Sequence, residues 1–221
     1  MGKGRTIAER ILAIDCATAA CSVALFDIDA AGGTAEVAGT FEILGRGHAE
    51  RLVPMIAELP DRGRADRIAV ARGPGSFTGV RIGLAVARSL AFAWQADIVG
   101  YSTMALVAAM ARAAEGPQAL TVAMEGGHGE WFVQGFDAEG LGTGEARSMP
   151  PEQAVEAFAG PLVAGTVAER FVALSGSGTA LPLHSDARAF TSLPAHALGT
   201  DTAPIYGRAP DARLPGVQGA A

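Results

Sequence analysis

A glycine-rich loop is the stretch of this chain whose residue types and spacing most directly indicate chemistry. The segment GPGSFTG (residues 73–79) contains Gly73 and Gly75, which reach backbone angles closed to other residues. Such a loop can present its N–H groups to an anion, for example a phosphate. It is not a Walker A motif, because no lysine follows its last glycine. The alternative is a tight strand-to-helix connection in which Ser76 or Thr78 caps the helix.

The helix that follows the loop has an unusual stripe of small residues. They recur at every fourth position: Gly79, Gly83, Ala87 and Ala91. Each internal glycine costs about 0.5–1 kcal/mol relative to alanine, so close packing should offset the loss. We expect a docking surface, against the sheet of the same chain or against a partner. Arg81 and Arg88 lie seven residues apart on a different face of this helix.

Metal chemistry has little support in the sequence. Cys16 and Cys21 are the only cysteines, and we expect both to be reduced and buried. The four histidines are scattered without ligand spacing, and no HExxH motif occurs. The sequence therefore predicts no metal site.

Composition and charge limit the classes of protein to which the chain can belong. The chain has 221 residues, of which 49% are hydrophobic, but no run approaches the ~18 apolar residues of a membrane span. Its N-terminus runs directly into a strand-like segment without a cleavage-site pattern, which indicates a cytoplasmic protein. A net charge of −6 argues against independent binding to nucleic acid phosphates.

Hydrophobic periodicity predicts an alternation of strands and helices in the first half. We expect strands over 11–14, 21–26, 37–44, 67–71 and 97–101, and helices within 45–59, 76–93 and 103–114. In the first helix, Pro54 should lie in the first turn. Four residues should form its buried face: Leu52, Val53, Ile56 and Leu59.

The residues after 118 repeat the pattern of a strand pair followed by a helix. Two strands about a glycine-rich turn are expected within 119–137, a third within 144–149, and a helix over 150–159. We therefore predict an α/β protein of two similar halves, at 1–114 and 115–208, with a loose tail at 209–221.

Three segments together are similar to one known family. ILAIDCATAACSVALFD, GHAERLVPMI and RGPGSFTGVRIGLAVARSLAFA resemble the bacterial TsaB family, also called YeaZ, at the same places and in the same order. The resemblance is dense from Ile11 to about Val107. It implies the actin, sugar-kinase and Hsp70 (ASKHA) architecture of two ribonuclease-H-like halves. It also implies a part in making threonylcarbamoyladenosine beside the anticodon of tRNAs.

The resemblance further implies that the protein is not itself an enzyme. Members of that family support the catalytic paralogue TsaD. For this chain we expect TsaE in the same complex, only indirect contact with tRNA, a homodimer when it is alone, and no membrane. TsaD has a metal-binding His-x-x-x-His where this chain has Thr103 and Val107. The resemblance therefore implies a scaffold or dimerization subunit.

The resemblance places the partner interface, with TsaD or with a second copy, on the helices within 48–59 and 76–93. The implied interface residues are His48, Leu52, Ile56, Ser76, Phe77, Thr78, Gly79, Val80, Gly83 and Ala87.

The resemblance also implies candidate residues for a nucleotide site. Asp15 and Thr18 match the first phosphate loop of the wider superfamily, and with Gly73 and Gly75 they are candidates for a nucleotide or anion contact. The alternative is that Asp15 and Thr18 brace their own turn. We expect no cofactor of the protein's own and leave open ATP or ADP at the complex interface. An ATP-dependent phosphotransferase of the sugar-kinase type is the alternative function.

The second half matches the family less well. Members have a D-A-R-x-G-E segment where this chain has residues 125–130, with Gly127 in place of the arginine, and a Y-L-R where it has residues 206–208. Residue roles from that half are therefore not carried over.

Overall fold

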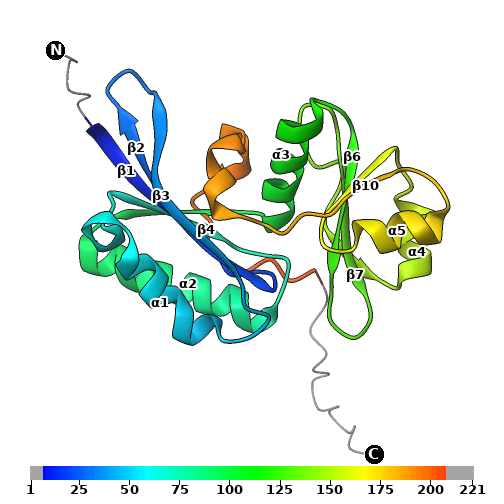
Figure 1. Ribbon diagram of the computed structural model, residues 1–221, viewed down its shortest axis with the longest axis horizontal. Coiled ribbons are helices and arrows are strands. Elements are labelled where there is room, and N and C mark those ends of the chain that lie inside the picture. Colours follow the sequence, from blue (N-terminus) through cyan, green and yellow to red (C-terminus); the bar gives the residue numbers. More distant parts are fainter. Residues whose placement is uncertain (1–6, 208–221) are drawn as a thin grey trace, which may run out of the picture.

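The computed structural model describes residues 7–207, which form two β-sheets with helices on their faces (Figure 1). The first sheet has the strand order β11-β5-β4-β1-β2-β3. Its strands are β1 (Ile7–Asp15), β2 (Ala20–Asp29), β3 (Thr34–Ile43), β4 (Arg67–Ala71), β5 (Asp97–Tyr101) and β11 (Leu198–Gly199). β1 pairs antiparallel with β2 and parallel with β4, so the predicted N-terminal hairpin is confirmed.

Helices cover both faces of this sheet. α1 (His48–Glu58) and α2 (Phe77–Trp94) lie side by side on one face (Figure 1). α3 (Thr103–Glu115) and the short 3₁₀ helix η2 (Ala187–Ser192) lie on the other. Burial on both faces explains why residues 11–15 are a continuous buried run instead of an alternating one.

The second sheet repeats the plan of the first with shorter elements. Its order is β10-β9-β6-β7-β8, from β6 (Leu120–Glu125), β7 (Trp131–Phe136), β8 (Arg147–Met149), β9 (Leu162–Ala164) and β10 (Thr179–Leu181). In both sheets the first three strands are antiparallel neighbours and the fourth pairs parallel with the first. The prediction of two similar α/β halves is therefore confirmed.

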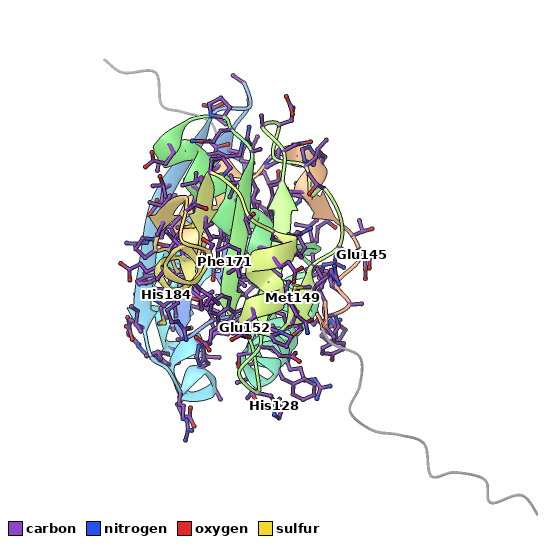
Figure 2. The ribbon with its side chains drawn as sticks, turned by 90° about the vertical axis from the view of Figure 1, so that its right-hand side faces the viewer. His128, Glu145, Met149, Glu152, Phe171 and His184 are labelled. Carbon is purple, nitrogen blue, oxygen red and sulfur yellow. The ribbon has the colours of Figure 1, made fainter. Side chains whose placement is uncertain are left out.

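The outer face of the second sheet is covered by two short helices. α4 (Pro151–Ala157) and α5 (Ala168–Ser175) contact each other and bury Phe171 against Trp131, with ring centroids 5.9 Å apart. Figure 2 looks onto this face, with Phe171 and Met149 labelled. α3 packs on the inner face, so it contributes to the cores of both halves.

Two details of α1 differ from the prediction. Val53 is 52% exposed, and the buried face is formed instead by His48, Leu52, Met55 and Ile56. Pro54 lies in the interior of the helix and not in its first turn, because α1 begins directly after Gly47, whose φ is 93°.

The predicted second half, 115–208, is not one continuous unit. After β10 the chain returns to the first sheet, where Ala187, Phe190 and Leu193 are buried in the first core and β11 pairs with β5. The predicted tail at 209–221 lies outside the described residues. Within 7–207 no helix is long and apolar enough to cross a membrane.

Candidate functional site

The loop between β4 and α2 packs directly onto the β1–β2 turn. A Cβ at Gly75 would lie 2.0 Å from the carbonyl oxygen of Ala17, so only glycine permits this approach. The Ser76 N–H donates to the same oxygen (2.7 Å), and Ser76 Oγ accepts from the Gly79 N–H (3.2 Å). Gly73 is buried with φ 90°. These residues form the tight strand-to-helix connection with Ser76 as the cap, and two amides of this loop, those of Ser76 and Gly79, are already bonded within the chain.

The stripe of small residues on α2 faces the protein's own sheet. A Cβ at Gly79 would lie 2.0 Å from the carbonyl oxygen of Cys16, and one at Gly83 would lie 3.6 Å from Cys16 Cβ. Ala87 and Ala91 are buried as well. The expectation that Gly79, Gly83 and Ala87 form an outward partner surface is therefore wrong, because the helix uses this stripe to approach β1 and β4.

Four further residues expected at the partner interface are also buried in the chain's own core: Val80 of α2, and His48, Leu52 and Ile56 of α1. The remaining three, Ser76, Phe77 and Thr78, are exposed at the start of α2. Apolar residues on a surface helix usually pack against the sheet that the helix covers. Their type and spacing alone therefore do not tell whether they belong to the core or to an interface.

The outward faces of α1 and α2 carry apolar residues that the sequence analysis did not select. Phe92 near the end of α2 is 89% exposed, and Ala85, Ser89 and Ala93 are exposed on the same helix. On the adjacent α1, Val53 and its neighbours Pro54 and Ala57 are exposed. The spacing of residues 85, 89, 92 and 93 is a helical face, which is the signal that could have found it.

A cleft with a volume of about 970 Å³ lies where loops of the two halves meet. Its lining comes from the β1–β2 turn, the start of α2, the β6–β7 turn and the chain near Tyr206. Five of the residues predicted for a partner or nucleotide contact line it, namely Thr18, Gly75, Ser76, Phe77 and Val80, whereas Asp15 and Gly73 do not. Three aromatic side chains line it: Phe77, Phe132 and Tyr206.

Asp15 is buried and bonded to its own turn. Its Oδ1 accepts from the Ala17 N–H at 2.9 Å, whereas its Oδ2 is buried with no hydrogen-bond partner among the described residues. Burial raises the pKa of Asp15 to about 7, against the opposing effect of the Ala17 and Ser185 hydrogen bonds, and nearby Asp186 raises it further.

Thr18 is likewise held within the turn. Its Oγ1 accepts from the Ala20 N–H (3.1 Å) and lies 3.4 Å from Ser185 Oγ. His48 Nε2 lies 3.0 Å from the Thr18 carbonyl oxygen and 3.2 Å from that of Ala20. Because carbonyl oxygens only accept, Nε2 carries the proton and donates to both. His48 thus ties the start of α1 to this turn.

No group of three or more His, Cys, Asp or Glu side chains is placed to hold a metal ion anywhere in residues 7–207. Cys16 and Cys21 are free, buried thiols with their sulfur atoms 3.4 Å apart. Thr103 and Val107 are buried on α3.

The glycine-rich turn of the second half is a closed hairpin between β6 and β7. The Gly126 N–H donates to the Glu130 carbonyl oxygen (2.9 Å), and the Glu130 N–H donates to that of Gly127 (3.1 Å). His128 lies in this turn with φ 58°, and Figure 2 shows it at the lower edge of the view. Of the C-terminal motif, Tyr206 is half-exposed beside the cleft, and Arg208 lies outside the described residues.

A family model described as "TsaD: tRNA N6-adenosine threonylcarbamoyltransferase" matches residues 41–194. Among curated proteins, the chain is 39% identical over 143 residues to the "tRNA threonylcarbamoyladenosine biosynthesis protein TsaB" of Escherichia coli, covering 62% of this chain and 59% of that protein. It is 34% identical over 111 residues to the protein of the same name from Bacillus subtilis, covering 48% of this chain and 46% of the relative. The chain thus matches between about half and three fifths of these relatives' lengths.

Solved structures give a longer match. A Pseudomonas aeruginosa protein described as similar to peptidase YeaZ superposes with a TM-score of 0.73 at 29% identity, covering 90% of this chain and 99% of the other. A second structure, named YeaZ from the same organism, has a TM-score of 0.71 at 28% identity, covering 89% and 99%. Both halves of the described fold therefore have counterparts in these proteins.

Proposed function

Because the chain belongs to the family described by the TsaD model, and within it to the TsaB (YeaZ) group, we propose that it takes part in forming N6-threonylcarbamoyladenosine in tRNA. Its architecture is the two-halved ASKHA fold. In this proposal it is a non-catalytic subunit that holds TsaD in a competent conformation.

The exposure of Phe92 carries the proposal. A phenylalanine that is 89% exposed on an ordered helix contributes nothing to its own core, and exposed apolar surface marks sites of protein association. The outward face of α1 adds Val53, Pro54 and Ala57. We therefore place the TsaD contact on the outward faces of α1 and α2, which replaces the buried residues expected from sequence.

The other partners are proposed from family membership and net charge. TsaE joins through the complex, and tRNA contacts the other subunits, because a net charge of −6 disfavours direct phosphate binding. In the absence of TsaD, a second copy pairs through the same faces, since related subunits can share an isologous patch. The complex works in the cytoplasm.

Of the four residues considered for a nucleotide, Thr18 and Gly75 line the cleft and Asp15 and Gly73 do not. The Oδ1 of Asp15 is bonded to the Ala17 N–H. The Ser76 and Gly79 amides are bonded within the chain. We therefore propose no cofactor of the protein's own; ATP or ADP, if bound, lies at the junction with TsaD. Calorimetric titration of ATP into the free chain and into the complex separates the two cases.

Reconstitution tests the proposed function. Threonylcarbamoyladenosine formation by TsaD and its other partners is measured with and without this protein. We expect no modification by the chain alone and a large gain when it is added to TsaD. Full activity without it would contradict the proposal. Modification by the chain without TsaD would contradict the non-catalytic role.

A further inference from the structure

We propose that residues 201–207 form a strap that holds the two halves at a fixed spacing across the cleft, with Arg81 and Arg88 of α2 as its latch. The inference stands apart from the proposed function, because it depends only on contacts within this chain.

The two ends of the strap are bonded to different halves. The Ile205 N–H donates to the carbonyl oxygen of Arg72, directly after β4 of the first sheet, at 2.7 Å. Two residues later, the Gly207 carbonyl oxygen accepts from the Ser148 N–H of β8 in the second sheet at 3.0 Å. The strap therefore crosses from one half to the other within three residues.

Side chains of the first half hold the strap along its length. Arg72 Nη1 lies 2.5 Å from Asp201 Oδ2, and Arg88 Nη2 donates to the Thr202 carbonyl oxygen at 2.8 Å. Arg81 donates to the Tyr206 hydroxyl oxygen from Nη2 (3.1 Å) and Nε (3.3 Å). The seven-residue spacing of Arg81 and Arg88 puts both on one face of α2, and the strap lies along that face.

Three glycines let the strap lie too close for a side chain. A Cβ at Gly100 would lie 2.6 Å from the Asp201 carbonyl oxygen, and one at Gly73 would lie 3.0 Å from that of Ile205. A Cβ at Gly207 would lie 2.6 Å from Phe132 Cδ1 of the second half and 3.4 Å from Pro74 Cβ of the first. The strap is thus fitted against backbone and ring atoms of both halves.

The latch also lies at the cleft. The Arg81 guanidinium carbon lies 3.5 Å from the centroid of the Phe77 ring, and the Phe77 and Tyr206 rings are 5.8 Å apart. All three residues line the cleft. The link from α3 to β6 and the return from β10 to η2 also join the halves. Arg81, Arg88 and Tyr206 are exposed, so substituting them loosens the strap without removing a buried side chain from either core.

Distance measurement between the halves tests the strap. Arg46 precedes α1 and Glu152 lies on α4, and both are exposed. Arg46→Cys and Glu152→Cys accept nitroxide labels, whereas the native thiols at Cys16 and Cys21 are buried. Pulsed electron paramagnetic resonance then gives the interlabel distance distribution in the full chain.

Two independent strap variants are compared with a matched control. One combines Arg81→Gln with Arg88→Gln, the other is Tyr206→Ala, and the control is Arg64→Gln, an exposed arginine on the loop before β4. We expect both strap variants to give a longer and broader distance distribution and the control to match the parent. Circular dichroism identifies any variant that fails to fold, and the other variant then decides. A parent-like distribution in the folded strap variants overturns the proposal.

Discussion

The backbone of α2 at Gly79 packs against the backbone of Cys16, the residue directly after β1: a Cβ at Gly79 would lie 2.0 Å from the Cys16 carbonyl oxygen. The neighbouring stripe position, Gly83, leaves 3.6 Å to Cys16 Cβ, an ordinary contact distance. The two glycines of this stripe are therefore packed differently. Gly79 is required by the approach of helix and strand, whereas Gly83 has room for a methyl group.

Alanine substitution should separate the two glycines. Gly79→Ala forces the helix away from a backbone oxygen and should lower the free energy of unfolding by ~1–3 kcal/mol. Gly83→Ala meets ordinary contacts and gains helix propensity, so it should raise stability by up to ~1 kcal/mol. Urea denaturation of both variants checks the difference. Equal losses would show that the stripe is packed equally tightly along its length.

The cap of α2 gives a second prediction. Ser76→Ala removes the acceptor for the Gly79 N–H and should cost about 0.5–2 kcal/mol of stability. Thr78→Ala, inside the first turn and exposed, is the matched control and should change stability by less than ~0.5 kcal/mol. Thermal unfolding of both variants measures the effect. A larger loss of stability for Thr78→Ala would show that Thr78, and not Ser76, caps the helix.

Buried Asp15 should make stability depend on pH. Its pKa is raised from 3.8 to about 7 by burial, so the folded state binds its proton more tightly than the unfolded state. This contribution to stability is fully present below pH 3.8 and is lost as the pH rises through 7. Asp15→Asn keeps the oxygen that accepts from Ala17 and has no carboxyl proton to lose.

The unfolding free energies of the parent and of Asp15→Asn should therefore diverge with pH. Between pH 5 and pH 8 the parent should lose about 2–3 kcal/mol relative to the variant. Denaturation at a series of pH values gives the difference directly. A constant difference over this range would mean that Asp15 titrates at its ordinary pKa.

The order of helices and strands can be predicted from the sequence because its hydrophobic periodicities are strong. The buried face of α1 cannot be predicted in the same way. Leu52, Ile56 and Leu59 fix the phase of that helix, and Val53 and Met55 fit beside them equally well in the sequence. The sheet buries Met55 and leaves Val53 exposed. Assigning Val53 to the buried face, where the structure has Met55, therefore concealed part of the outward surface.

Interactions distant in sequence could not be predicted at all. The seven-residue spacing of Arg81 and Arg88 predicts that they share one face of the helix. Their partners, Tyr206 and Thr202, lie more than a hundred residues later in a segment without periodicity. The return of Phe190 to the first core was missed for the same reason. Local patterns predict elements, and they carry no signal for where an irregular segment docks.

The affinity of this chain for TsaD, with and without Phe92, tests the central claim most directly. Phe92→Ser removes an aromatic side chain that is 89% exposed, so the chain should remain folded while its Kd for TsaD rises by roughly 30-fold or more, the loss typical of an interface hot spot. Leu174→Ser on α5, where the leucine is 46% exposed, is the control and should bind as the parent does. Calorimetric titration measures the affinity of each variant. An unchanged Kd for Phe92→Ser would contradict the assignment of the partner surface to α1 and α2.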